Sequence, residues 1–154
     1  MHFADFLDFD AIKTALPGGN KRSLLQQLAN LAAQRLGLDP AAVHASLAER
    51  EQLGSTGFGQ GVAIPHGKIQ GLSRIYGLFA RLAEPVDYKA IDGRPVDLVF
   101  LLLSPPDAGA EHLKALAAIS RVTRHVPTLE KMRGARSRDA LAAVLIGADE
   151  RDAA

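Results

Sequence analysis

A glycine-rich stretch between residues 54 and 67 places the strongest constraint on how this 154-residue chain can fold. Glycines stand at positions 54, 57, 59 and 61, and His66 follows between Pro65 and Gly67. Glycine is used where φ must be positive or where the backbone must approach another group closely. Proline fixes its own φ and biases the preceding Ile64 toward an extended conformation. The stretch therefore predicts a tight loop leading into a short strand, Val62–Pro65, with a histidine held at its end.

The same loop suits a phosphate group. Successive backbone N–H groups in such a turn can form a concave anion-binding site, and we assign its backbone part to Gly57 and Gly67. Arg50 offers a guanidinium that can hold phosphate oxygens in bidentate fashion. Thr56 offers a hydroxyl. Arg50 can equally be a helix-end arginine in water, and Thr56 can equally be a structural turn residue.

Histidine suits a phosphoryl carrier because its ring nitrogen is nucleophilic at neutral pH while the N–P bond stays reactive. One ring nitrogen must be free, and a hydrogen bond to the other fixes the tautomer. We assign the nucleophile to His66. A second histidine, His112, stands where a helix is expected to begin after a strand, and ligands of open α/β sheets collect at such positions. If the two strand ends adjoin, both imidazoles face one pocket.

These residues resemble the phosphorylation-site signature of the fructose/mannitol-type IIA domains of the phosphoenolpyruvate-dependent phosphotransferase system (PTS). The positions that carry the resemblance are Arg50-Glu51, Gly54-Ser55-Thr56-Gly57, Gly59, Gly61 and Ala63-Ile64-Pro65-His66-Gly67. The resemblance extends over nearly the whole chain through Lys21-Arg22, the segment Val86–Asp97 and Glu111-His112-Leu113. Within the family, the stand-alone chain and the wording of residues 53–56 are most similar to the nitrogen-related branch, IIA-Ntr.

The resemblance implies a cytoplasmic phosphocarrier that accepts a phosphoryl group on Nε2 of His66 from an HPr-like or NPr-like carrier protein. It implies that a backbone carbonyl holds Nδ1, and that Arg50 and His112 act on the transferring group. Such a protein is a phosphotransferase component rather than a stand-alone metabolic enzyme, and it uses no cofactor and no metal. Two outputs stay open: phosphorylation-dependent regulation of protein targets, or transfer to a separate fructose/mannitol-type sugar permease.

Composition disfavours several other classes of protein. A formal net charge of +1 offers no basic field for nucleic acid. The absence of cysteine excludes disulfides, thiol catalysis and thiolate metal sites. A metal-dependent hydrolase that uses the two histidines with Asp107 or Glu111 is disfavoured, because no ligand pair stands at short helical spacing. The longest apolar run, Leu98–Leu103, is too short to span a membrane, and the acidic N-terminus is unlike a signal peptide.

The periodicity of the chain predicts one α/β domain, residues 1–154, with a mixed sheet of about four to five strands covered by helices on both faces. The expected helices are Leu24–Leu36, Ala41 to about Arg50, Ala110 to about His125 and Ser137–Ile146. The expected N-caps are Ser23, Asp39 and Ser137, and Asp107 or Gly109 opens the third helix. The expected strands are Val62–Pro65, Ile75–Leu82 and Asp97–Leu103, with a hairpin turn at Asp92-Gly93 and a short strand or turn within Phe9–Leu16.

A carrier must expose its histidine to its partners, so we expect shallow and partly apolar surroundings. Phe58, between two glycines of the loop, can serve as an apolar anchor or can turn inward to the core. Phosphorylation adds about −1.5 to −2 charges to such a surface. A regulatory target that buries an apolar patch is therefore expected to prefer the unphosphorylated protein.

Overall fold

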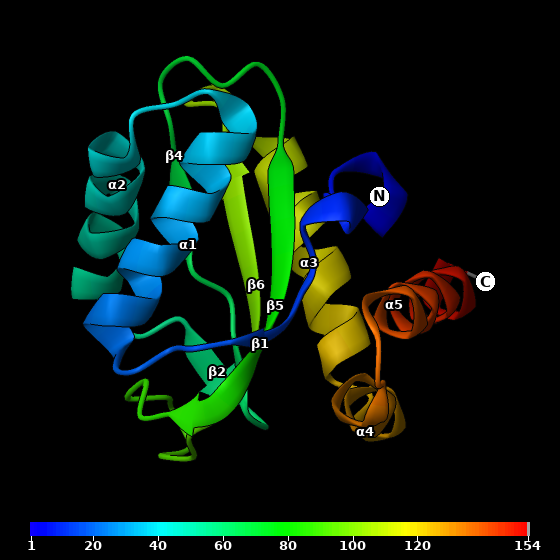
Figure 1. Cartoon of the computed structure of the whole chain (residues 1–154). Helices are drawn as coiled ribbons and strands as arrows, with labels where there is room; N and C mark the ends of the chain where they lie inside the picture. Colours follow the sequence, from blue (N-terminus) through cyan, green and yellow to red (C-terminus); the bar gives the residue numbers. More distant parts are fainter. Residues whose placement is uncertain (154) are drawn as a thin grey trace.

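The computed structural model describes residues 1–153, with side chains as far as residue 150. A mixed sheet lies between two helical layers (Figure 1). One face of the sheet is covered by two helices, α1 (Lys21–Leu36) and α2 (Pro40–Gln52). The other face is covered by three helices, α3 (Ala110–Thr123), α4 (Val126–Gly134) and α5 (Arg138–Ala153). The predicted α/β sandwich with helices on both faces is confirmed.

The sheet is built around one long hairpin. Its strands, in chain order, are β1 (Lys13–Leu16), β2 (Gly57–Gly59), β3 (Val62–Ala63), β4 (His66–Lys68), β5 (Tyr76–Val86) and β6 (Val96–Ser104). β5 and β6 are antiparallel neighbours at the centre, and β1 pairs parallel with β5 at one edge. On its other side β6 pairs parallel with both β3 and β4, and β2 pairs antiparallel with β3. His66 thus lies beside Leu102 of the central strand.

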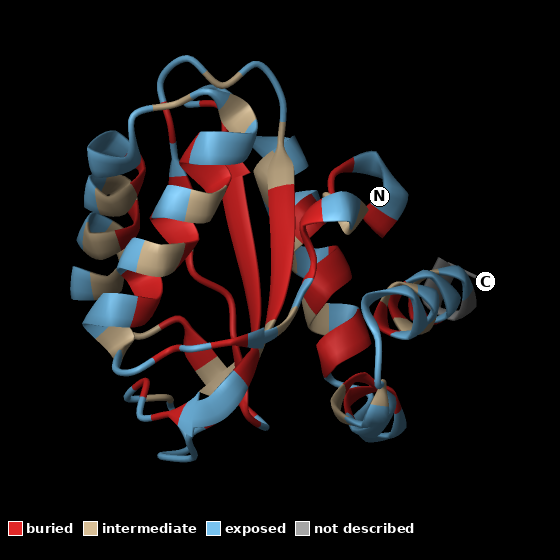
Figure 2. Cartoon of the chain, viewed as in Figure 1, coloured by how far each residue is buried: buried red, intermediate tan, exposed pale blue. Residues whose placement is uncertain are grey.

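The continuous apolar run of β6 predicts a central strand. The structure confirms this, because both faces of β6 are buried. Successive residues of a strand point to opposite faces, and here the two faces serve two separate cores (Figure 2). The core beneath α1 and α2 receives Val99, Leu101 and Leu103, whereas the core beneath α3, α4 and α5 receives Leu98, Phe100 and Leu102. In the described part of the chain, no helix is long and apolar enough to cross a membrane.

Several predicted boundaries need correction. α1 begins at Lys21 because Asn20, rather than Ser23, is its N-cap; the Asn20 Oδ1 accepts a hydrogen bond from the Ser23 N–H at 2.8 Å. The helix predicted to run to about His125 ends at Thr123, and the next residues form α4, which the sequence did not predict. N-caps at Asp39 and Ser137 are confirmed by their hydrogen bonds to Ala41 and Ala140.

The glycine-rich segment also differs from its prediction, because it forms three short strands rather than one. β2 and β3 make a tight hairpin, and β4 follows after Pro65. His66 therefore begins a strand instead of ending one, since the parallel pairing with β6 resumes after the proline. The predicted hairpin turn at Asp92-Gly93 is confirmed within the loop between β5 and β6, where Gly93 has a φ of 73° and donates to the Ala90 carbonyl at 3.0 Å.

Candidate active site around two histidines

A pocket of about 400 Å³ lies between the C-terminal turn of α2, strand β4 and the first turn of α3. The residues that line it are Ser46, Glu49, Arg50, Leu53, His66, Gly67, Lys68 and His112. It thus brings together four of the predicted site residues from three separate elements: His66, His112, Arg50 and Gly67. Gly67 is required there because a Cβ at this position would collide with Ser46 of α2.

The hydrogen bonds of His66 define its tautomer. Its Nδ1 lies 2.7 Å from the carbonyl oxygen of Ile64. A carbonyl can only accept, so Nδ1 carries the ring proton. The opposite nitrogen, Nε2, accepts a hydrogen bond from the Nε–H of Arg50 at 3.2 Å. His66 therefore presents the lone pair of Nε2 toward Arg50. Nε2 is the nitrogen that is expected to be nucleophilic.

The surroundings keep His66 neutral. Burial lowers the pKa of His66 below its ordinary value of 6.5. The carbonyl of Ile64 works in the opposite direction by accepting a hydrogen bond, and the positive charge of Arg50 lowers the pKa further. At neutral pH the imidazole is consequently unprotonated at Nε2 and available for attack.

Arg50 is fixed from two sides. It stands in the last turn of α2, and its Nη1 donates to the carbonyl of Gly54 at 2.9 Å while its Nε donates to His66. Gly54 has a φ of 147°, a conformation in which a side chain would be strained. The glycine therefore lets the chain turn back so that its carbonyl holds the guanidinium beside Nε2.

His112 faces His66 from the first turn of α3. The two ring centroids are 5.5 Å apart and the ring planes are inclined by 54°. The Nδ1 of His112 lies 2.5 Å from the hydroxyl oxygen of Ser104, at the end of β6. Burial lowers the pKa of His112, and so do the charge of Lys68 and the charge that His66 would carry if protonated. A second neutral imidazole thus stands beside His66 at neutral pH.

Thr56 and Gly57 lie elsewhere. The side chain of Thr56 is buried, and its hydroxyl contacts the carboxylate of Glu51 and the Tyr88 hydroxyl, the latter at 3.0 Å. Gly57 lies in β2, where a Cβ would collide with Tyr88 and Ala90. The structure does not bring these two residues into the histidine pocket, and their contacts brace the loop that follows Arg50.

A buried ionic cluster that the sequence reasoning did not assign lies behind the pocket. Glu51 forms an ion pair with Lys21 at 2.7 Å and accepts a hydrogen bond from the Tyr88 hydroxyl at 3.0 Å. The Lys21 ammonium also lies 4.4 Å from the centre of the Tyr88 ring. Burial opposes ionisation of Glu51, but Lys21 and Thr56 together hold its pKa below the usual range. The sequence places Lys21, Glu51 and Tyr88 within the family resemblance but gives no sign that their side chains meet.

Exposed leucines, rather than Phe58, provide apolar surface near the pocket. Phe58 is half-buried and packs against the core beneath α3, α4 and α5, so the inward orientation is the correct one. Leu53, which lines the pocket, is 82% exposed, and Leu113, next to His112, is 66% exposed. A partner that approaches His66 therefore meets aliphatic side chains.

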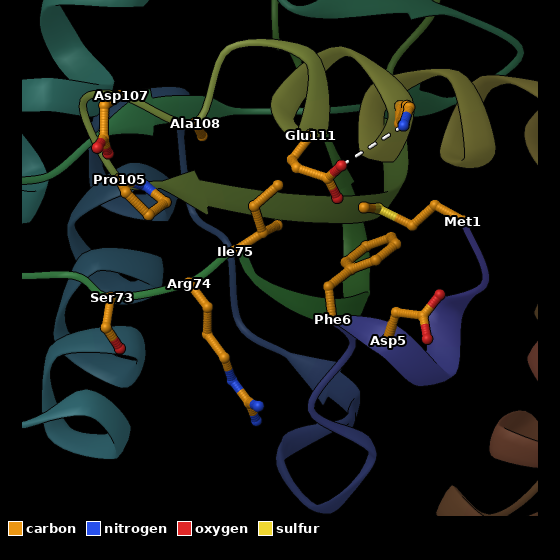
Figure 3. Close-up of a pocket in the computed structure, with 11 residues that line it drawn as sticks. Met1, Asp5, Phe6, Ser73, Arg74, Ile75, Pro105, Asp107, Ala108 and Glu111 are labelled. Atoms are coloured by element: carbon orange, nitrogen blue, oxygen red, sulfur yellow. Dashed lines mark ion pairs between the residues drawn. The ribbon is translucent and has the colours of Figure 1, made fainter.

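A second, larger pocket of about 530 Å³ lies between the N-terminal segment, residues 73–75 and the start of α3 (Figure 3). Met1, Phe6 and Ile75 supply its apolar wall, and Glu111 there pairs with Lys114 at 3.5 Å. No histidine lines this pocket.

Among the described residues, no group of three or more histidine, aspartate and glutamate side chains is arranged to hold a metal ion. The histidine pocket is the candidate active site because it brings His66, His112 and Arg50 together.

Known proteins share the sequence and the architecture of nearly the whole chain. The family model for the phosphoenolpyruvate-dependent sugar phosphotransferase system, EIIA 2, matches residues 5–147. A nitrogen regulatory protein of Bradyrhizobium diazoefficiens is 49% identical over 145 residues, which cover 94% of this chain and 95% of the relative. The PTS system fructose-specific EIIA component of Haloferax volcanii is 38% identical over 84% of each chain. The crystal structure of nitrogen regulatory protein IIA-Ntr from Neisseria meningitidis has a TM-score of 0.87 and 36% identity, covering 93% of this chain and 98% of that one.

Proposed function

The chain belongs to the EIIA type 2 family of the phosphoenolpyruvate-dependent sugar phosphotransferase system, and we propose that it carries a phosphoryl group on Nε2 of His66. The phosphoryl donor is a small HPr-like or NPr-like carrier protein. The observation that supports this role most directly is the state of His66, whose Nδ1 is bound to the Ile64 carbonyl while Nε2 keeps its lone pair beside Arg50. In this proposal the phosphocarrier acts in the cytoplasm.

The transfer is an in-line exchange between a histidine of the donor protein and His66. The lone pair of Nε2 attacks phosphorus, the N–P bond of the donor breaks, and its electron pair returns to the donor's ring. The proton on Nδ1 stays in place, so the phosphorylated ring becomes cationic. The Ile64 carbonyl, 2.7 Å from Nδ1, stabilises that cation. Because a protonated ring leaves as neutral imidazole, the same hydrogen bond keeps the phosphoryl group ready for onward transfer.

Arg50 and His112 act on the phosphoryl oxygens. Phosphoryl transfer depends mainly on positioning and on stabilising charge at the equatorial oxygens. The guanidinium already touches Nε2, and the His112 ring is 5.5 Å from the His66 ring, so both residues adjoin the imidazole that receives the phosphoryl group. Removing one such contact costs roughly 2–4 kcal/mol in the transition state. Neither residue carries the phosphoryl group, so a variant of either one remains phosphorylatable at a reduced rate.

The experiment is phosphoryl transfer from labelled phosphoenolpyruvate through the first PTS enzyme and an HPr-like carrier. We expect an acid-labile, alkali-stable label on the wild-type protein and none on His66→Ala. His44→Ala is the matched control, because His44 is a half-buried histidine of α2 that does not line the pocket. Label that survives in His66→Ala would refute the assignment.

For the output of the phosphocarrier, the similarity to nitrogen regulatory proteins favours regulation of a protein target. The similarity to a fructose-specific EIIA component favours the alternative, transfer to a separate sugar permease. Regulation predicts a partner that binds the unphosphorylated form, because a phosphoryl group adds about −1.5 to −2 charges beside an apolar rim. Capture of binding proteins on immobilised protein in both phosphorylation states distinguishes the two, since a permease component must accept the phosphoryl group and a regulated target need not.

A further inference from the structure

Ser104 stands out among the buried polar residues because of its single side-chain partner. It is the last residue of β6 and is 0% exposed. Its hydroxyl oxygen lies 2.5 Å from Nδ1 of His112, and it makes no other hydrogen bond within the described part of the chain. By contrast Thr123, another buried hydroxyl, donates to the carbonyl of Ile119 in its own helix at 2.8 Å.

The single partner decides the direction of the hydrogen bond. If Nδ1 of His112 carried a proton, it would donate to Ser104, and the serine's own O–H would be buried without an acceptor. An unsatisfied buried donor is costly, and native structures largely avoid it. The serine hydroxyl must therefore donate to Nδ1. In the neutral imidazole, the ring proton then resides on Nε2.

Ser104 is also rigidly placed relative to His66. Ser104 is paired with Lys68 of β4, the short strand that begins at His66. The carbonyl of Ser104 accepts a hydrogen bond from the Ile69 N–H at 2.9 Å. Pro105 follows directly and restricts the backbone conformation of Ser104. The hydroxyl that orients His112 is thus held by the same strand that holds the nucleophile.

We infer that Ser104 is a positioning residue that fixes His112 in the Nε2–H tautomer, so that His112 donates a hydrogen bond to the phosphoryl group transferred to His66. This inference rests on the proposed phosphocarrier function. It gives the two histidines opposite tautomers: His66 offers a lone pair at Nε2, whereas His112 offers a proton there.

The assignment also explains why only one of two neighbouring imidazoles is the nucleophile. The Nδ1 of His112 faces the fully buried hydroxyl of Ser104, and its Nε2 carries the ring proton and has no lone pair to attack phosphorus. Burial and the neighbouring positive charges lower the pKa of His112, which keeps it in the neutral form to which this tautomer belongs. His112 therefore acts as a neutral hydrogen-bond donor rather than as a second carrier or an acid.

The first test is ¹⁵N nuclear magnetic resonance of the histidine rings in the unphosphorylated protein at pH 7.5. We expect His112 protonated on Nε2 in the wild type, and a mixture of tautomers in Ser104→Ala. The control is Thr123→Val, which removes another buried hydroxyl with little change of shape and leaves the His112 signals unchanged. A wild-type His112 protonated on Nδ1, or a tautomer that is the same in Ser104→Ala, overturns the inference.

The second test is a double-mutant cycle on the rate of phosphorylation. Ser104→Ala is expected to slow the transfer about tenfold, the order expected when one neutral hydrogen bond is lost. The same change in a His112→Ala background has no further effect, because Ser104 acts through His112. Ser104→Thr, which retains the hydroxyl, restores much of the rate. If the rate losses of Ser104→Ala and His112→Ala multiply in the double variant, the inference is contradicted.

If the wild-type protein itself takes up no phosphoryl label, the proposed function is refuted. The resonance measurement still decides the tautomer of His112 in that case.

Discussion

At the scale of single residues, the reactivity of His66 depends on what touches each ring nitrogen. Ile64 holds the proton on Nδ1 through its carbonyl, and Arg50 places a positive charge against Nε2. In the proposed transfer the same guanidinium acts in both states, since it disfavours protonation of His66 before transfer and attracts phosphoryl oxygens during transfer. A single cation can therefore both keep the nucleophile available and stabilise the charge that arrives.

The pH dependence of transfer tests this account of Arg50. The pKa of His66 is lowered from 6.5 by burial and by Arg50, and attack requires an unprotonated Nε2. The rate should therefore be constant through neutral pH and should fall only as the pH drops below 6.5. In Arg50→Met the pKa rises, so the acid limb moves to higher pH in addition to the general loss of rate.

The measurement is the single-turnover rate of phosphorylation as a function of pH, supported by a resonance titration of His66. Arg121→Met is the control, because it removes an exposed arginine of α3 that does not line the pocket and leaves the limb in place. An acid limb that stays in place or moves to lower pH in Arg50→Met would show that the guanidinium does not set the pKa of His66.

At the scale of elements, the ionic cluster of Lys21, Glu51, Thr56 and Tyr88 ties three segments together. Lys21 begins α1, Glu51 belongs to the last turn of α2, and Tyr88 lies in the loop between β5 and β6. Burial raises the pKa of Tyr88, and so does the Glu51 carboxylate, so the phenol stays protonated and donates to Glu51. Because Glu51 directly follows Arg50, the cluster also fixes the turn that presents the guanidinium.

Glu51→Gln should therefore be strongly destabilising. Breaking a buried ion pair by removing one partner costs about 3 kcal/mol or more. The pKa of Glu51 is lowered from 4.5 in the folded state, so its charge contributes stability above pH 4.5 that is lost as the pH falls through the lower, folded-state value. The difference in unfolding free energy between wild type and Glu51→Gln should be largest at neutral pH and should shrink as the pH falls below 4.5.

Urea unfolding at several pH values provides the measurement. The control is Glu130→Gln on α4, an exposed glutamate whose substitution is expected to change stability by less than about 0.5 kcal/mol. If Glu51→Gln unfolds like the control at pH 7, the cluster does not hold the three segments together.

At the scale of the whole molecule, the proposed function requires a carrier protein to dock over the pocket, and Leu53 is an exposed apolar residue that lines it. We expect Leu53→Ser to raise the KM for the carrier protein about tenfold with little change in kcat, because burying a leucine side chain is worth about 1.5–3 kcal/mol. The matched control is Ile91→Ser, since Ile91 is 79% exposed but does not line the pocket. Equal effects of the two substitutions would remove Leu53 from the docking surface.

The sequence predicted the family, the layers of the fold and four of the residues that line the pocket, because those depend on local patterns. The apolar run of β6 and the motif from Arg50 to Gly67 are visible without any partner. What it could not predict depends on contacts between distant residues. The partner of the Thr56 hydroxyl, Tyr88, is 32 residues away, and nothing near Ser104 signals that its hydroxyl meets His112.

The boundary errors have a similar origin. The sequence prediction ends the preceding helix near His125 and assigns no element to residues 126–136, where α4 lies. The C-terminal end of α4 depends on a distant contact, because Nη1 of Arg81 in β5 donates to the carbonyls of Met132 and Ala135 at 2.8 and 2.6 Å. No spacing rule connects residue 81 with the end of a helix near residue 134.

The central claim is that the phosphoryl group is carried on Nε2 of His66. Its most direct test is a ¹⁵N and ³¹P resonance measurement of the uniformly ¹⁵N-labelled protein after phosphorylation by the carrier. We predict a one-bond phosphorus–nitrogen coupling to Nε2 of His66, with Nδ1 still protonated toward Ile64. A coupling to Nδ1 of His66, or to any nitrogen of His112, would contradict the account.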